Sequence, residues 1–350
     1  MESGERDRLE ADSPDGSGAS APGDDGGVRS DAAGDGDGDG NGVRAFGDRL
    51  TELVERRGSQ LVLGLDPDPA RLWPRAIEFA GGAGDPPAPP AARAALAVSL
   101  HCRLAIEAAG ESCVAVKLQV ACFERLGAPG WAALEDICAR ARDAGLLIIA
   151  DAKRGDIDVS AAAYGQAFFG ETPSPFGTVQ GLGADALTVN PLLGRDSLAP
   201  LAAAARAQGG GLFALVRTSN PGAADVQELA LEGGGTVSER LSALIDELGG
   251  EGVGDSGLSD VGAVVGATAP ERLARMRELM PRAVFLLPGV GAQGGRVEDL
   301  APAFAPGRAA GLIAVSRGIV YAHERDGGAP ETAAAREAAR LRELAWSLSD

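Results

Sequence analysis

The sequence predicts a single-domain (β/α)8 barrel, or TIM barrel, behind an acidic N-terminal tail. From residue 61 onward, short apolar runs alternate eight times with stretches rich in Ala, Leu, Arg and Glu. Polar side chains follow these runs, at the ends where a barrel of parallel strands keeps its chemistry. Because no exact sequence repeat supports the count of eight, a doubly wound parallel sheet remains the structural alternative.

The first 41 residues are expected to form a disordered tail. They hold 12 acidic residues against three arginines, so their net charge of −9 is half of the −18 of the whole chain. This Gly-, Ser-, Ala- and Asp-rich segment has almost nothing apolar to bury. We therefore assign the barrel domain to residues 42–350 and interpret the breaker-rich stretches 81–90 and 249–259 as surface loops.

Composition narrows the class of protein. The body is acidic and shows no long basic stripe, which argues against a general nucleic-acid binder or a protein of anionic membrane surfaces. Neither a secretory signal nor a stretch of membrane-spanning length is apparent, so we expect a cytoplasmic protein. Cys102, Cys113, Cys122 and Cys138 lack CxxC spacing, which predicts reduced, mostly buried thiols.

The eight apolar runs are expected to form the barrel strands in chain order. They cover residues 60–66, 113–119, 146–153, 185–190, 211–219, 261–268, 283–290 and 310–318. Each is short and apolar, as in strands that are buried on both faces. The stretches 91–110 and 130–145 carry apolar residues at helical spacing, and each contains a glycine that should end its helix.

The expected strand ends carry a set of polar residues. These are Asp66, Lys117, Asp151, Lys153, Asp156, Asn190, Ser219, Thr268, Gln293 and Arg317, of which Gln293 lies just beyond Pro288. In ADAKRGDI, Asp151 and Lys153 lie two residues apart on an extended segment, so both should point to one face, where Lys117 can approach the same carboxylate. Neighbouring opposite charges would keep both ammonium groups protonated. The alternative is a structural ion-pair network at the barrel rim.

A second constellation follows the last two strands. PGVGAQGGR (288–296) is a glycine-rich loop, and SRGI (316–319) places Arg317 just before a helix. Phosphate sites in this fold lie after strands seven and eight, where an arginine can add a bidentate contact. The alternative is a glycine-rich turn without a ligand. His101 and His323 are absent from the strand ends, which argues against a zinc site or a Ser-His triad and leaves lysine and aspartate for catalysis.

Seven motifs together resemble the orotidine 5′-phosphate decarboxylase family, in its longer bacterial form. In chain order they are LGLDPDP, VAVKLQVACFE, ADAKRGDI, VNPLLGRD, VRTSNPGA, LLPGVGAQGG and AVSRGIVYA, within residues 43–325. Each motif is weak alone, but the ordered set is specific. The resemblance implies decarboxylation of orotidine 5′-phosphate to UMP, the last step of de novo UMP synthesis, without a cofactor or a metal.

The resemblance also implies roles for individual residues. Lys153 would protonate C6 of the pyrimidine, Asp151 would lie against the substrate carboxylate, and Lys117 would contact the ribose and hold Asp151. Asp66 would bind ribose hydroxyls. Asp156 would reach into the active site of the other subunit of a homodimer. The remaining candidates for substrate binding are Ser219 at the pyrimidine, Gln293 and Arg317 at the phosphate, and the strand-end residues Asn190 and Pro288.

Three other functions remain open. Barrels with a D-x-K-x-x-D motif include magnesium-dependent enzymes that act on sugar phosphates. A Schiff-base aldolase would use Lys153 or Lys117 with a lowered lysine pKa, which flanking carboxylates oppose. A non-catalytic barrel would only hold a nucleotide.

Overall fold

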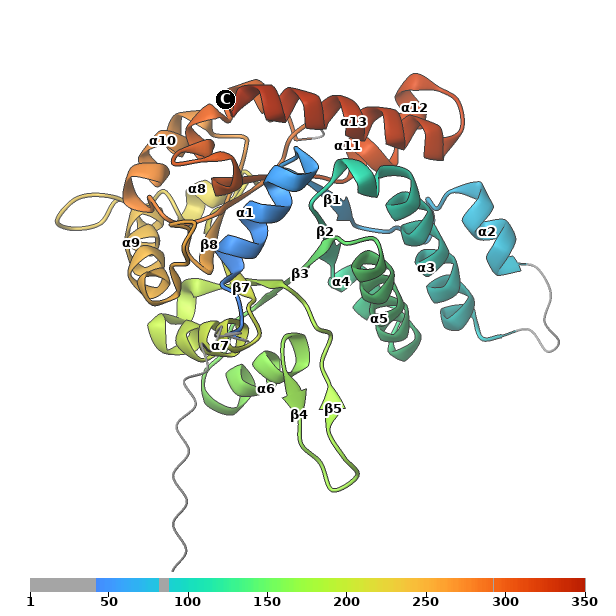
Figure 1. Cartoon of the computed structure of the whole chain (residues 1–350), viewed down its shortest axis with the longest axis horizontal. Helices are drawn as coiled ribbons and strands as arrows, with labels where there is room; N and C mark the ends of the chain where they lie inside the picture. The colour runs from blue at the N-terminus through green and yellow to red at the C-terminus, as the bar shows by residue number, and fades with distance from the viewer. Residues whose placement is uncertain (1–41, 82–87, 292, 350) are drawn as a thin grey trace, which may run out of the picture. The chain divides into compact units, whose positions relative to one another are not determined.

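Eight parallel strands close into a barrel with helices around it, as the sequence predicts (Figure 1). The computed structural model describes residues 42–81, 88–291 and 293–349. The tail expected at 1–41 and most of the loop expected at 81–90 therefore lie outside the described residues. Around the barrel the strands follow the order β1-β10-β9-β8-β7-β6-β3-β2. This closure rules out the doubly wound sheet.

Each barrel strand falls within or close to one of the eight apolar runs. The strands are β1 (Leu61–Leu65), β2 (Ala115–Gln119), β3 (Leu147–Arg154), β6 (Ala186–Val189), β7 (Gly211–Arg217), β8 (Val261–Val265), β9 (Phe285–Pro288) and β10 (Gly311–Val315). Successive strand residues are buried against different partners, because side chains alternate between the two faces of a strand. Leu61 and Leu63 join the cluster that includes the outer helices, whereas Val62 packs in a second cluster.

Helix α1 (Phe46–Arg57) belongs to that second cluster and covers the N-terminal end of the barrel. Phe46, Leu50 and Val54 pack there with Val62, and the Phe46 ring meets the Phe213 ring edge-on with centroids 6.0 Å apart. The opposite end of the barrel, where the strands finish, is free for the polar residues.

The other helices follow the strands in chain order. They are α2 (Pro74–Gly81), α3 (Pro90–Ala109), α4 (Ala121–Glu124), α5 (Ala128–Asp143), α6 (Asp158–Phe168), α7 (Arg195–Ala207), α8 (Ala223–Val226), α9 (Val237–Gly249), α10 (Pro270–Leu279), α11 (Arg317–Val320), α12 (Ala322–Asp326) and α13 (Pro330–Leu348). The helices expected at 91–110 and 130–145 are confirmed as α3 and α5. Gly145 follows α5 at φ +67°, but Gly110 stays right-handed and leads into a 3-10 turn, so only Gly145 acts as a left-handed stop.

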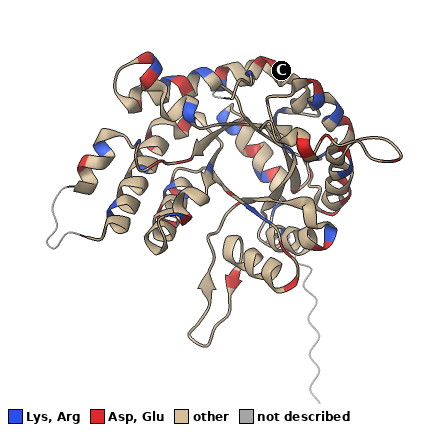
Figure 2. Ribbon diagram, turned by 180° about the vertical axis from the view of Figure 1, so that it is seen from behind, with Lys and Arg blue, Asp and Glu red and all other residues tan. Residues whose placement is uncertain are grey.

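Two strands lie outside the barrel. The antiparallel pair β4 (Glu171–Thr172) and β5 (Val179–Gln180) forms a hairpin that projects from the barrel next to α6 (Figure 1). Acidic and basic residues are interspersed along the outer helices (Figure 2). No helix in the described part of the chain is long and apolar enough to cross a membrane. Its four cysteines are unpaired, and all but the half-buried Cys122 are buried.

Candidate active site

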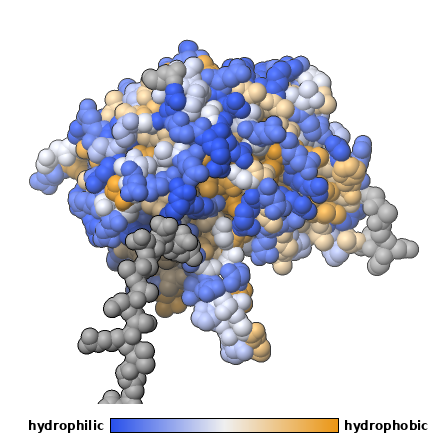
Figure 3. Space-filling view, in the orientation of Figure 1, coloured by the Kyte–Doolittle hydropathy of each residue, from blue (hydrophilic) through white to orange (hydrophobic). Residues whose placement is uncertain are grey.

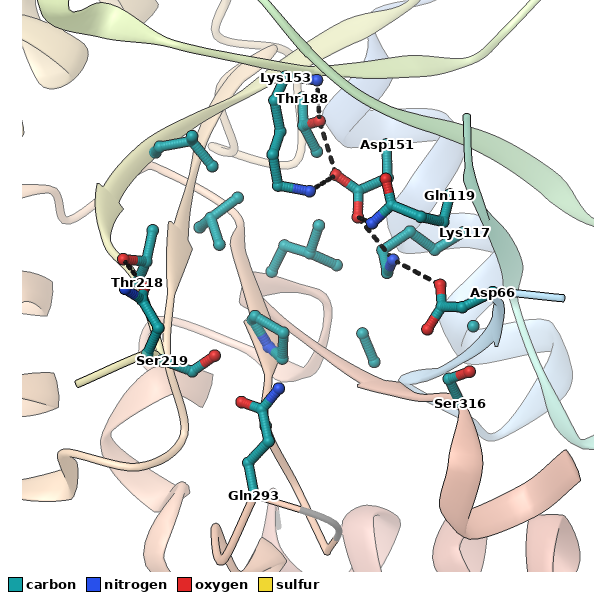
Figure 4. Close-up of a pocket in the computed structure, with 18 of the residues that line it drawn as sticks. Asp66, Lys117, Gln119, Asp151, Lys153, Thr188, Thr218, Ser219, Gln293 and Ser316 are labelled. Carbon is teal, nitrogen blue, oxygen red and sulfur yellow. Dashed lines mark hydrogen bonds and ion pairs between the residues drawn. The ribbon is translucent and has the colours of Figure 1, made fainter. Parts of the chain in front are cut away.

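A cavity of about 520 Å³ opens at the C-terminal ends of the barrel strands. Most of the predicted site residues line it: Asp66, Lys117, Asp151, Lys153, Ser219, Pro288, Gln293 and Arg317. They come from six different strands or the loops that follow them. In Figure 4 the side chains of Asp66, Lys117, Asp151 and Lys153 occupy one wall, while Ser219 and Gln293 reach in from the other. Parallel strands bring residues this distant in sequence to one rim.

A row of alternating charges forms the first wall. The Lys117 Nζ lies 3.5 Å from Asp66 Oδ1 and 2.6 Å from Asp151 Oδ2, and the Lys153 Nζ lies 2.5 Å from Asp151 Oδ1. Strands β2 and β3 pair side by side with Gln119 opposite Asp151, which brings Lys117 to that carboxylate. The predicted approach of both lysines to Asp151 is therefore confirmed.

Burial differs sharply along this row. The side chains of Lys117 and Asp151 are 9% and 8% exposed, whereas that of Lys153 is 45% exposed. Burial alone would raise the pKa of Asp151, but the two ammonium groups outweigh it and hold that pKa well below its usual range. Burial would lower the pKa of Lys117, yet Asp151 and Asp66 raise it. The ion pairs therefore favour the charged forms of Lys117 and Asp151, as predicted for the Lys117 ammonium group.

The backbone at Lys153 differs from the extended segment that we expected. Its φ is +51°, and the pairing of β3 with β6 shifts register between Ala150 and Arg154. A left-handed backbone is costly for a side chain other than Gly and is typical of functional positions. Lys153 and Asp151 still meet, and the Lys153 ammonium group donates to the Asp151 carboxylate although the strand pairing is irregular around them.

Two further residues hold Asp151, and sequence analysis missed both. The Thr188 hydroxyl donates to Asp151 Oδ1 at 2.8 Å and accepts the backbone N–H of Lys153 at 3.0 Å. The Gln119 amide donates to Asp151 Oδ2 at 3.1 Å. Thr188 is 1% exposed inside β6. Threonine is common in strands, so the sequence does not single out Thr188; the need of its buried hydroxyl for a hydrogen-bond partner becomes evident only in the fold.

The glycine-rich loop shapes the opposite wall. Gly289 has φ +104°, and a Cβ at this position would lie 3.0 Å from the Gln293 side chain and 3.2 Å from Ser219. A side chain here would therefore strain the backbone and crowd two lining residues. The Thr268 hydroxyl donates to the Ser219 carbonyl at 3.1 Å, which ties the loops after β7 and β8 together.

Two predicted site residues do not line this cavity. Asn190 is exposed, and its side chain accepts the Leu192 N–H, so it caps the turn after β6 instead of facing the cavity. The Asp156 carboxylate accepts the N–H of Ile157 and lies outside the cavity. Strand-end position was correct for both, but the local turns direct their side chains elsewhere.

The segment after β7 also contributes lining residues that sequence analysis did not single out as site residues. Thr218, Asn220 and Gln227 line the cavity beside Ser219. The Gln227 side-chain oxygen accepts the Thr218 N–H at 2.8 Å, which fixes the loop after β7. Among the described residues, no group of three or more His, Cys, Asp or Glu side chains is arranged to hold a metal ion.

Comparison with known proteins agrees with the geometry. Residues 59–331 match the family model described as orotidine 5′-phosphate decarboxylase / HUMPS family. Orotidine 5′-phosphate decarboxylase of Deinococcus radiodurans is 42% identical over 296 residues, which cover 83% of this chain and 94% of that protein. That of Rhodopirellula baltica is 37% identical, with 81% and 91% covered. The structure of Leishmania donovani OMP decarboxylase shares 31% identity with a TM-score of 0.64 and covers 87% of this chain and 99% of its own. The chain therefore belongs to the orotidine 5′-phosphate decarboxylase / HUMPS family.

Proposed function

We propose that the cavity at the strand ends is the site where this enzyme decarboxylates orotidine 5′-phosphate to UMP in pyrimidine biosynthesis. The observation that carries the proposal is the Lys117–Asp151–Lys153 row, with the glycine-rich loop and Arg317 across a cavity of about 520 Å³. A charged rim of this kind can hold a phosphorylated ligand at one end and act on its carboxylate at the other.

Lys153 is the proton donor in this proposal. Loss of carbon dioxide breaks the bond between C6 and the carboxylate, and the electron pair stays on C6. The Lys153 Nζ then transfers a proton to C6, which yields UMP. Lys153 suits this role better than Lys117, because its side chain is 45% exposed to the cavity and can regain a proton from solvent. Lys117 is buried between two carboxylates and instead orients Asp151.

The other cavity residues bind the substrate. Asp66 lies next to Lys117 and takes the ribose hydroxyls, while Ser219 contacts the pyrimidine. Gln293 and Arg317 take the phosphate, and Pro288 packs against the ring. Phosphate contacts far from C6 supply binding energy that can organise the loops around the reacting atoms.

We further propose a cytoplasmic homodimer with shared active sites. Next to Asp156, apolar side chains remain exposed on one side of the barrel rim: Ile157 (45%), Val159 (83%), Leu192 (69%) and Leu193 (55%). The hairpin tip carries a fully exposed Phe176, and apolar atoms are visible at the end of the projecting hairpin in Figure 3. Contiguous exposed apolar side chains are typical of an interface. A second copy covering them would bring Asp156 toward its partner's cavity.

Decarboxylation is tested by following the loss of orotidine 5′-phosphate absorbance with and without EDTA. We expect turnover in both conditions and none with Lys153→Ala. Arg103→Ala, a change at an exposed helical arginine paired with Glu107, is the matched control and should keep full activity. Turnover only with added magnesium would move the assignment to a metal-dependent sugar-phosphate enzyme. Unchanged activity of Lys153→Ala would refute its role.

Shared sites are tested by mixing two inactive variants, Lys153→Ala and Asp156→Ala. A hybrid dimer holds one site with both native residues. Random exchange in an equal mixture should therefore restore about a quarter of wild-type activity. A mixture that stays inactive, although size-exclusion chromatography shows exchange between tagged and untagged subunits, would contradict the shared site.

A further inference from the structure

A second cavity lies against the phosphate end of the candidate active site. It has a volume of about 700 Å³ and lies between the glycine-rich loop and helices α11 to α13. The two cavities share Val290 and Arg317 in their walls. A ligand held at Arg317 in the first cavity is therefore next to the second.

The second cavity is basic in an acidic protein. Five arginines line it: Arg71, Arg296, Arg317, Arg325 and Arg340. Three glutamates line it as well: Glu298, Glu324 and Glu337. The lining thus has a net charge of +2, whereas the chain has a net charge of −18. This local reversal of sign favours an anionic ligand.

The ion pairs within the cavity leave some of its positive charge uncompensated. Glu324 pairs with Arg71 through both of its oxygens. Glu337, whose side chain is 8% exposed, is shared by Arg340 at 2.9 Å and Arg325 at 3.3 Å. Asp326, just outside the lining, pairs with Arg325 at 2.7 Å and Arg336 at 3.4 Å, so two carboxylates face three guanidinium groups.

Four of the arginines in the second cavity are exposed, so that a ligand can reach their guanidinium groups. The side chains of Arg325 and Arg340 are 56% and 58% exposed. Arg296 is 69% exposed and lies 3.7 Å from Glu298. Arg317 is exposed as well, and none of the ion pairs found among the described residues involves it. A ligand phosphate can therefore approach several guanidinium groups without displacing a buried pair.

We propose that the second cavity binds the outer phosphates of a uridine di- or triphosphate whose base, ribose and first phosphate occupy the active site. The inference rests on the proposed function, because it takes the substrate's phosphate to lie at Arg317. The second and third phosphates of such a nucleotide continue past Arg317 among Arg296, Arg325 and Arg340. A monophosphate ends at Arg317 and leaves the second cavity unfilled.

With this geometry, a nucleotide made from the product UMP can inhibit the enzyme. Phosphoryl transfer onto UMP is the class of reaction that produces the ligand. A nucleotide that spans both cavities excludes orotidine 5′-phosphate, so it acts as a competitive inhibitor. Its affinity exceeds that of UMP by the contacts of the outer phosphates. Charge-assisted hydrogen bonds of this kind correspond to a gain of roughly tenfold or more in affinity.

The test compares UMP, UDP and UTP as inhibitors of decarboxylation in the presence of EDTA. We expect the wild-type inhibition constant to fall by about tenfold or more from UMP to UTP. Arg340→Gln and Arg325→Gln should each remove much of this preference while the inhibition constant of UMP and the turnover of substrate stay unchanged. In Arg340→Gln the buried Glu337 keeps Arg325 as a partner. Arg103→Gln, on the distant helix α3, is the matched control and should keep the preference.

Three results would overturn the proposal: equal inhibition by UMP and UTP, a preference for UTP that both variants retain, or an equal loss of affinity for all three nucleotides. Pyrophosphate distinguishes a nucleotide that spans both cavities from a free oligoanion bound in the second cavity alone. If it binds as tightly as UTP in isothermal titration calorimetry without competing with substrate, the cavity holds a free oligoanion and the spanning nucleotide is wrong. Failure of the proposed function would appear differently, as a folded wild-type protein without turnover.

Discussion

Replacing Lys117 by methionine tests whether the buried charges depend on one another. The change keeps most of the side-chain volume but leaves the Asp151 carboxylate, 8% exposed, without its 2.6 Å partner. Removing one member of a buried pair typically costs about 3–5 kcal/mol. Since Lys153 and Thr188 still contact Asp151, we expect the free energy of unfolding to fall by about 3 kcal/mol, the lower end of this range.

The pH dependence of this loss has a defined sign. The pKa of Asp151 is lowered in the folded state, so its contribution is present above its ordinary pKa of 3.8 and is lost as the pH falls below that value. The pKa of Lys117 is raised above 10.5, so its contribution is present below that value and is lost as the pH rises above it. The difference between wild type and variant should therefore be constant from about pH 5 to pH 9 and narrow outside that window.

Urea unfolding followed by circular dichroism measures this difference. The double variant Lys117→Met/Asp151→Leu removes both buried charges and should recover stability to within about 1 kcal/mol of wild type, although it stays inactive. Lys153 tolerates the loss of its partner in this variant, because its side chain is 45% exposed. A loss below about 1 kcal/mol for Lys117→Met, as for an exposed pair, would refute the reasoning. So would a double variant less stable than the single one.

Three further changes probe other contacts. Thr188→Val removes the hydroxyl that donates to Asp151, so kcat should fall about tenfold or more with KM nearly unchanged, whereas Thr188→Ser should retain most activity; equal kcat for both variants would contradict a positioning role. Arg277→Met removes a buried guanidinium that donates to four carbonyl oxygens, so urea unfolding should show a loss of about 3 kcal/mol or more with kcat unchanged; a small loss would mean that water replaces the guanidinium. Burial lowers the pKa of His101 to about 4, so unfolding should become easier by up to about 3 kcal/mol as the pH falls from about 6.5 to 4. In His101→Asn this dependence should be weaker, and an identical profile would assign it to other groups.

The barrel could be predicted because parallel strands buried on both faces are apolar throughout. The strand ends could not be placed as well. Thr218 and Ser219 were expected in the fifth strand, but β7 ends at Arg217, because pairing with β8 is irregular there and the chain turns into the loop beside the cavity. The hairpin of β4 and β5 carries only two paired residues in each strand, too few for a periodic signal.

The row of charged residues could be predicted because a lysine or an aspartate is conspicuous in an apolar strand. Lys117 and Asp151 stand out in this way, and their meeting follows from the pairing of neighbouring strands. Thr188 does not stand out, since threonine is common in strands. The residue types around Lys153 do not predict its left-handed backbone conformation. It is a property of the register shift between β3 and β6, which depends on tertiary structure.

The distribution of partners along the charged row indicates how the site favours reaction over binding. Asp151 already accepts from Lys117, Lys153, Thr188 and Gln119. In the proposed pose, a substrate carboxylate beside Asp151 meets another carboxylate and no unpaired cation, so this part of the substrate gains little in the ground state. Once carbon dioxide leaves, that repulsion ends and the negative charge on C6 faces Lys153, the one partner of Asp151 in this row that is well exposed to the cavity. The interaction is therefore stronger in the transition state than in the bound substrate, which is the condition for a rise in kcat.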